Sequence, residues 1–208
     1  MNQNQENRRE LNKRQCRKRI LKASRRLFSG KGYEDTTMDD VAKRAEVSRA
    51  TLYNYFPSKV SLLVGIAEAE LADMHHLIND ELKNEPSDLL KLRRVLEVVV
   101  YDTVSYIALS RKITYLNSCP ESSMYAIRLD MLKIFTELVE GAQRQGDFCP
   151  DAEVGKIVDM IMGIYLMAQF EWNNITNYSE EYCTEKLRWF FSHMLAGVCP
   201  PEGLARIQ

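Results

Sequence analysis

The helical spacing of apolar residues is the feature that most restricts how this chain can fold. Cys16, Ile20, Ala23 and Leu27 recur every three or four residues near the N-terminus, as on the buried side of an amphipathic helix. The sequence contains no sustained apolar–polar alternation and no Asn-Gly or Asp-Gly hairpin turn. We therefore predict an all-α protein with helices over residues 10–29, 37–45, 49–56, 59–82, 89–110, 112–117, 123–145, 152–173 and 179–196.

Charge divides the chain into two unequal parts. Residues 1–59 hold fifteen Lys and Arg against seven Asp and Glu, a balance of +8, whereas residues 60–208 hold thirteen against twenty-two, a balance of −9. A basic module joined to an acidic body indicates that the first part binds a polyanion, although a basic solvated tail has the same composition. We place two domains over residues 1–58 and 59–208.

The composition is that of a globular protein, with 45% hydrophobic and 27% charged residues in a chain of 208. No apolar run reaches the ~18–20 residues of a membrane helix, and the polar N-terminus lacks the apolar stretch of a secretory signal. The five cysteines form no CxxC pair, which favours reduced thiols over a zinc site. We therefore expect a cytoplasmic, nucleoid-associated protein without metal or cofactor.

The sequence contains no P-loop, nucleophile elbow, dinucleotide fingerprint or HExxH motif, and it therefore gives no indication of an enzyme.

The segment from residue 37 to residue 59 has the pattern of a helix-turn-helix. Thr37-Met-Asp-Asp40 has the form of a capping box, Ser48 can cap a second short helix, and Pro57 prevents that helix from continuing. At ~100° per residue, Leu52 and Phe56 fall on one side of the second helix, and we predict that this side faces the core.

The opposite side of this second helix carries Ala50, Thr51, Tyr53 and Asn54, with Arg49 on its flank. This side lacks the Glu and Lys residues of an ordinary solvated helix. A small residue permits close approach to a DNA major groove, an arginine can form two hydrogen bonds with guanine, and hydroxyl groups can bind phosphates. The pattern thus favours DNA recognition, with an ordinary helical hairpin as the alternative.

The motifs Gly32-Tyr33, Thr36-Thr37 and the segments 41–48 and 51–59 resemble the DNA-binding domain of TetR-family transcriptional regulators over residues 15–65. The resemblance implies an all-α homodimer with an N-terminal three-helix helix-turn-helix domain and a larger helical domain for ligand binding and dimerisation. It also implies a repressor that binds a palindromic double-stranded DNA operator and is released by a small-molecule effector. Carried over by position, it implies phosphate contacts from Thr37, Ser48, Tyr53, Tyr55 and Lys59, and base-edge contacts from Arg49, Ala50, Thr51 and Asn54.

Two features of the N-terminal part leave alternatives open. Glu46 stands in the turn where the family commonly has glycine, and a positive φ there would cost this residue about 1 kcal/mol. The basic arm from Arg8 to Arg19 can enter the DNA minor groove or only add nonspecific attraction to phosphates.

The helix predicted over residues 152–173 is apolar nearly all round, so we expect it to be buried on more than one side. Together with the helix over 179–196, it is predicted to form a four-helix interface between two subunits, as the resemblance also implies. A purely intramolecular core is the alternative.

A small apolar or aromatic effector is expected to bind in the acidic body, among the fourth to eighth predicted helices of the chain. The candidate residues combine aromatic rings, methionines and a few polar groups. They are Tyr101, Asp102, Tyr106, Tyr115, Met124, Met162, Tyr165, Gln169 and Trp172. A ligand-independent DNA-binding architectural or adaptor protein is the alternative for the chain as a whole.

Overall fold

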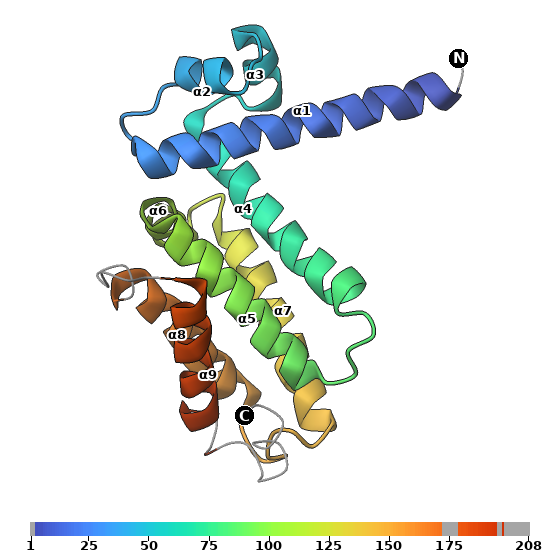
Figure 1. Cartoon of the computed structure of the whole chain (residues 1–208), viewed down its shortest axis with the longest axis vertical. Helices are drawn as coiled ribbons and strands as arrows, with labels where there is room; N and C mark the ends of the chain where they lie inside the picture. The colour runs from blue at the N-terminus through green and yellow to red at the C-terminus, as the bar shows by residue number, and fades with distance from the viewer. Residues whose placement is uncertain (1–2, 172–178, 195–196, 198–208) are drawn as a thin grey trace.

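The computed structural model describes residues 3–171, 179–194 and 197, and its regular structure in these ranges is helical, with no strand. A small N-terminal lobe sits on a larger helical body, and α4 runs from one into the other (Figure 1). The N-terminal helices are α1 (Gln3–Gly30), α2 (Met38–Arg44), α3 (Arg49–Tyr55) and α4 (Lys59–His76). The body adds the π-helical turn Leu77–Glu81, then α5 (Asp88–Ser105), α6 (Ile107–Asn117), α7 (Tyr125–Arg144), α8 (Val154–Glu171) and α9 (Glu180–Met194). Among the described helices, none is both long and apolar enough to cross a membrane.

Local capping explains where the short helices begin. Thr37 accepts a hydrogen bond from the backbone N–H of Asp40, and the Asp40 carboxylate accepts one from the backbone N–H of Thr37. Ser48 caps α3 by accepting from the N–H of Thr51, and Ser58 caps α4 by accepting from that of Ser61. The predicted starts of α2, α3 and α4 are therefore confirmed.

The described residues form two hydrophobic cores. The first contains Ile20 and Phe28 of α1, Val41 of α2 and Leu52 of α3, and it continues past residue 58 into α4, α6 and the segment before α7. Gly65 allows α4 to approach this core, because a Cβ atom there would lie 2.7 Å from the Phe56 ring. The second core lies among α5, α7, α8 and α9. The α1, α2 and α3 helices are therefore packed directly on α4 and α6.

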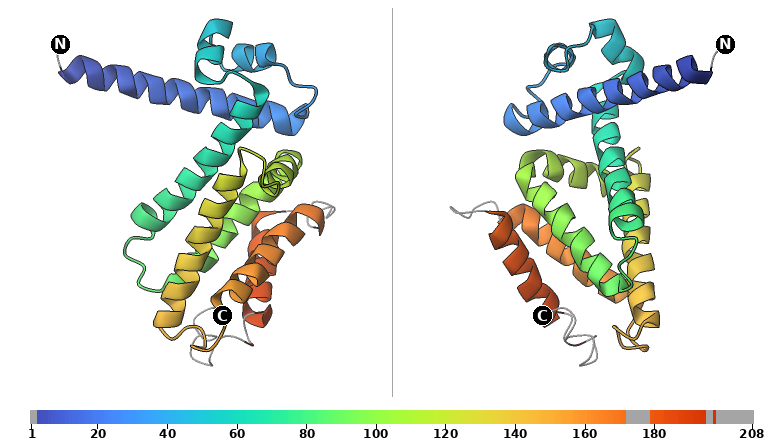
Figure 2. Two further views of the ribbon diagram at one scale, coloured as in Figure 1. Left: turned by 180° about the vertical axis from the view of Figure 1, so that it is seen from behind. Right: turned by 45° about the vertical axis from the view of Figure 1, so that its right-hand side comes forward.

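Several predicted helix limits differ from the structure. The α1 helix begins at Gln3, so the basic stretch from Arg8 to Arg19 is helical and projects beyond the rest of its lobe (Figure 2). Tyr106 has φ −130° and ψ 44°, which ends α5 at Ser105 and lets α6 begin at Ile107. The spacing of apolar residues continues through this break and therefore conceals it from the sequence. The α4 helix ends at His76, where the π-helical turn begins.

Candidate nucleic-acid interface and ligand cavity

The α3 helix presents its polar side to solvent, as its periodicity predicts. Leu52 is fully buried and Phe56 is 4% exposed, so both anchor the helix in the N-terminal core. Arg49, Ala50, Tyr53 and Asn54 are exposed on the other side, and Thr51 is half-buried. This side is consequently available to a ligand as large as a DNA duplex.

The turn between α2 and α3 fixes the direction of α3. Glu46 has φ +53°, the left-handed conformation that favours glycine. The N–H of Glu46 donates to the Lys43 carbonyl and the N–H of Val47 donates to the Ala42 carbonyl, which together form a Schellman motif. The condition stated for Glu46 is therefore met, and a glutamate with this positive φ carries a backbone cost of about 1 kcal/mol.

Arg49 makes exposed contacts with two neighbouring side chains, Asp39 and Tyr53. Its guanidinium Nε lies 3.3 Å from Asp39 Oδ1, and its Cζ lies 5.7 Å from the Tyr53 ring centroid. The side chains of Arg49 and Asp39 are 68% and 63% exposed, so water screens this ion pair and it adds little stability. The guanidinium can therefore exchange Asp39 for a base edge at low cost.

The hydroxyl groups predicted to contact phosphates have different surroundings. Thr37 and Ser48 are exposed but also cap their helices, and Ser48 Oγ lies 2.7 Å from Thr51 Oγ1. Tyr55 is half-buried beside α1, where burial and the neighbouring Cys16 raise the pKa of its phenol. Tyr53, with 39% of its surface exposed, is the more accessible of the two tyrosines.

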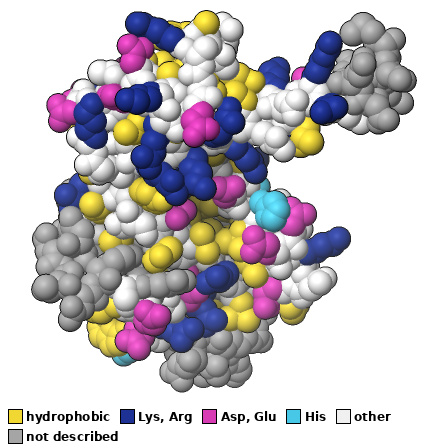
Figure 3. Space-filling view, turned by 45° about the horizontal axis from the view of Figure 1, so that its top comes forward, with side chains coloured by type: hydrophobic (Ala, Val, Ile, Leu, Met, Phe, Trp, Pro, Cys, Tyr) yellow, Lys and Arg dark blue, Asp and Glu magenta, His cyan; other side chains and the backbone are white. Residues whose placement is uncertain are grey.

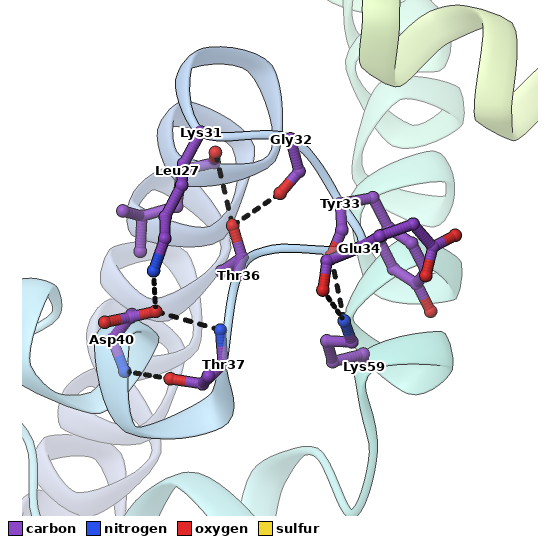
Figure 4. Close-up of polar contacts among 9 residues, drawn as sticks. All are labelled: Leu27, Lys31, Gly32, Tyr33, Glu34, Thr36, Thr37, Asp40 and Lys59. Carbon is purple, nitrogen blue, oxygen red and sulfur yellow. Dashed lines mark hydrogen bonds and ion pairs between the residues drawn. The ribbon is translucent and has the colours of Figure 1, made fainter.

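Lys59 is engaged inside the lobe. Its Nζ donates to the Tyr33 carbonyl at 2.8 Å and to the Glu34 carbonyl at 3.0 Å, and it lies 4.7 Å from the Tyr33 ring centroid (Figure 4). Sequence reasoning missed these bonds, because Tyr33 and Glu34 are about 25 residues away along the chain. An ammonium group has three N–H donors, and the two carbonyls accept from two of them. A phosphate contact can therefore use only the remaining donor.

Ion pairs and hydrogen bonds of its side chains attach the loop from residue 31 to residue 36 to its neighbours. Lys31 pairs with Asp40 at 2.6 Å, and Thr36 Oγ1 donates to the Gly32 carbonyl at 2.7 Å (Figure 4). The bond from Lys31 and those from Thr37 lower the pKa of Asp40 to about 2. Lys112 of α6 pairs with Glu34 at 2.8 Å. Through this last pair, the loop links the N-terminal lobe to the body.

Positive charge is concentrated on the N-terminal lobe (Figure 3). Residues 7–15 of α1 are all exposed, and the exposed basic residues include Arg8, Arg9, Lys13 and Arg14. A surface of this kind attracts phosphates without regard to sequence.

A cavity of about 70 Å³ lies in the body, and α4, α5, α6, α7 and α8 all contribute to its lining. Its volume suffices for several water molecules or for the head group of an organic ligand. Asp102 and Tyr165 are the predicted ligand residues that line it. Glu70, Leu71, Met74, Asn117 and Met131 also line it, and the prediction omitted them.

The other predicted ligand residues lie elsewhere. Tyr101 and Tyr115 are 38% and 68% exposed on the surface, and Met124 and Met162 are buried in the two separate cores. Gln169 is fully buried and donates from Nε2 to Thr114 Oγ1 at 2.9 Å. Tyr106 lies beneath the Arg25 guanidinium, with Cζ 4.1 Å from its ring centroid. Trp172 falls outside the described residues.

Arg25 connects the N-terminal lobe to the cavity. It extends from α1, and its Nη2 lies 3.4 Å from Glu70 Oε1 of α4 and 3.4 Å from Asp102 Oδ2 of α5. Both carboxylates line the cavity. The Arg25 Nε is buried without a hydrogen-bond partner among the described residues, and the guanidinium contacts these two carboxylates and the Tyr106 ring.

Comparison with known proteins agrees with this geometry. Residues 20–66 match the family model described as bacterial regulatory proteins, tetR family. A stretch of 70 residues is 50% identical to the HTH-type transcriptional repressor KstR of Rhodococcus jostii and covers 34% of this chain and 31% of KstR. A stretch of 104 residues is 32% identical to the HTH-type transcriptional regulator EthR of Mycolicibacterium smegmatis and covers 49% and 48% of the two chains.

The similarity in fold extends over most of the chain. The structure of TylP, a TetR regulator from Streptomyces fradiae, superimposes with a TM-score of 0.69 at 22% identity and covers 93% of this chain and 91% of that chain. The sequence matches to KstR and EthR are shorter than this structural match. The chain matches about a third of the length of KstR and about half that of EthR. The two lobes therefore share an architecture with TylP, while the match to the family model is confined to residues 20–66.

Proposed function

We propose that this chain is a TetR-family regulator that acts as a sequence-specific DNA-binding transcriptional repressor, because residues 20–66 match the model of bacterial regulatory proteins of the tetR family. In this proposal it binds a palindromic operator in the nucleoid as a homodimer, and a small molecule releases it. The observation that carries the proposal is the orientation of α3, whose apolar side is anchored by Leu52 while its polar side faces solvent.

The α3 helix would enter the major groove. Arg49 would pair with guanine, Ala50 and Thr51 permit close approach and apolar contact with a thymine methyl group, and Asn54 suits adenine. The groups proposed to bind phosphates are Thr37, Ser48, Tyr53, Tyr55 and Lys59. The exposure of Thr37, Ser48 and Tyr53 supports this assignment most directly, because Tyr55 is half-buried and Lys59 has backbone partners.

Two copies of α3 are needed to read successive major grooves, which lie ~34–36 Å apart. The α8 and α9 helices are the proposed interface between the copies. Trp189 of α9 is 57% exposed and Phe190 beside it is half-buried, a costly arrangement for large apolar side chains in a monomer. Light scattering at micromolar concentration should give twice the monomer mass, and a monomeric mass would contradict this interface.

Release by an effector follows from the position of the cavity. A molecule bound among α4–α8 would press on Glu70 and Asp102, which hold Arg25 of α1. Movement of α1 and α4 would change the separation of the two α3 helices, so that they no longer match the grooves. By linkage, operator DNA must then weaken effector binding by the same factor.

Selection from a random pool of DNA duplexes tests the central claim. The purified protein should enrich one palindromic sequence and bind it about a thousandfold more tightly than a scrambled duplex at moderate ionic strength. Asn54→Ala should reduce this preference, while Lys133→Ala, on the exposed surface of α7, should leave it unchanged. Equal binding of all duplexes by the unmodified protein would overturn the proposal.

A further inference from the structure

The cavity in the body is acidic. Glu70 and Asp73 of α4 and Asp102 of α5 line it, and among the described lining residues there is no Lys, Arg or His. The Glu70 and Asp102 side chains remain 35% and 46% exposed, so a molecule in the cavity can reach them. A cavity with this lining repels anions and attracts cations.

A buried acceptor lies beside these carboxylates. Asn117 of α6 also lines the cavity and is 6% exposed, and its Oδ1 has no hydrogen-bond partner among the described residues. A buried carbonyl oxygen that is left unpaired destabilises the protein. A ligand that carries an N–H donor would supply the missing hydrogen bond, whereas a carboxylate ligand would not.

Arg25 neutralises the carboxylates only in part. One guanidinium is shared between Glu70 and Asp102, at 3.4 Å from each, and Asp73 adds a third negative charge. Burial raises the pKa of Glu70 to about 7 despite Arg25, and both aspartates act in the same direction. Burial raises the pKa of Tyr165, another lining residue, and Arg128 of α7 opposes this shift without lining the cavity itself. The site can therefore take up another positive charge.

The remaining lining is suited to an apolar body. Leu71, Met74 and Met131 line the cavity, and Met side chains adapt readily to the shape of a ligand. We propose that the cavity binds an organic cation, with an ammonium head group at Glu70, Asp102 and Asn117 and an apolar body against Leu71, Met74 and Met131.

The regulatory meaning of this inference rests on the proposed function. The ammonium group shares the carboxylates that hold Arg25, so the ionic attachment of α1 to α4 and α5 weakens when the cation binds. The effector thereby competes with a residue of the DNA-binding lobe for the same two side chains.

A matched series of three compounds tests the proposal on the full chain by calorimetric titration at pH 7.5. The compounds are 3-phenylpropylammonium, 3-phenylpropan-1-ol and 3-phenylpropanoate, which share an apolar body and differ in head-group charge. The ammonium compound should bind at least about tenfold more tightly than the alcohol, and the carboxylate should bind most weakly, because only the first complements the acidic lining. Equal affinities, a preference for the carboxylate, or no measurable binding of the ammonium compound would overturn the proposal.

Variants locate the head group. Glu70→Gln combined with Asp102→Asn should remove most of the advantage of the ammonium compound over the alcohol and leave alcohol binding nearly unchanged. Asp73→Asn, which leaves both partners of Arg25 in place, should reduce the advantage severalfold, and it decides the matter if the double variant does not fold. Glu137→Gln on the exposed side of α7 is the control. An advantage that survives in the folded variants would place the cation elsewhere and overturn the assignment.

The titration needs no DNA, so it stands apart from the proposed function. A second measurement adds the ammonium compound to the complex with the selected duplex, where it should weaken DNA binding. Failure to bind any duplex specifically would contradict the repressor proposal while the ligand preference stood. Specific DNA binding without an ammonium preference would contradict this inference alone.

Discussion

Lys59 Nζ lies 2.8 Å from the backbone carbonyl oxygen of Tyr33, so the first residue of α4 fastens the loop that precedes α2. The second bond, to the Glu34 carbonyl, strengthens the same attachment. A lysine that would serve as a phosphate ligand in the proposed complex is therefore also part of the structural support of the helix-turn-helix.

Replacing Lys59 with methionine should lower the free energy of unfolding by about 1–3 kcal/mol, because two charge-assisted bonds to backbone carbonyls are lost. Urea denaturation measures this loss, with Lys133→Met on α7 as the matched control. If the folded variant also binds DNA with a salt dependence about one unit shallower, Lys59 contacts a phosphate as well. Unchanged stability would contradict the supporting role.

Arg49→Ala should weaken binding to the selected operator by about 1–3 kcal/mol and broaden the base preference, because its guanidinium is proposed to read a base edge. Fluorescence anisotropy with the operator and with single-base variants measures both effects. Asp39→Asn removes the ion-pair partner of Arg49 but leaves the arginine itself in place, so it should leave base preference intact. Equal losses on every duplex would argue against base reading by Arg49.

Glu46→Gly should raise the free energy of unfolding by up to about 1 kcal/mol, because glycine adopts the positive φ of this turn without steric cost. Glu46→Ala provides the control, since it removes the charge but keeps the Cβ atom. The strain explanation requires that glycine stabilise the protein more than alanine does in urea denaturation. A gain of equal size in both variants would assign the effect to charge instead.

The environment of Glu70 predicts a specific dependence of stability on pH. Its pKa is about 7 in the folded protein against 4.5 for an ordinary glutamate, so the folded state holds this proton more tightly than the unfolded state. The stability contributed by the protonated carboxyl is fully present below about pH 4.5 and is lost as pH rises through 7. Arg25, Asp73 and Asp102 are the charged groups that act on Glu70.

The melting temperature of Glu70→Gln relative to the unmodified protein should therefore rise between pH 5 and pH 8. Glu140→Gln, on the exposed surface of α7, should show no such trend. A difference between Glu70→Gln and the unmodified protein that is independent of pH would contradict the raised pKa.

The exposed part of α1 should add affinity without specificity. Arg8→Gln combined with Arg9→Gln should weaken binding to all duplexes alike and make the salt dependence about two units shallower, if both side chains contact phosphates. Salt titrations of operator and scrambled DNA measure this. A change confined to A·T-rich duplexes would instead indicate minor-groove reading by this part of the helix.

The helix-turn-helix could be predicted residue by residue because its determinants are local. Thr37 with Asp40, and Ser48 with Thr51, are cap pairs three residues apart, and Leu52 and Phe56 occupy adjacent turns of one helix. The break at Tyr106 could not be predicted, because apolar residues keep helical spacing across it. The unusual conformation of Glu46 was identified through its place in the family motif, since its residue type alone favours no left-handed turn.

The ligand cavity shows what sequence patterns omit. Tyr101 and Tyr115 have the residue type expected in a pocket, yet packing of α5 and α6 turns both toward the surface. Glu70 and Asn117 line the cavity, although isolated polar residues in amphipathic helices are ordinarily solvated. Which side of each helix faces the cavity depends on its neighbours in space.

The sequence by itself determined where α2, α3 and α4 begin and which side of α3 is polar, because cap hydrogen bonds and periodicity within a few residues decide both. Only the tertiary structure decided that Arg25, Glu70 and Asp102 meet, since they come from three helices separated by tens of residues. Such meetings depend on how the helices cross and pack, and the energy of that packing is spread over many apolar contacts that no single motif records.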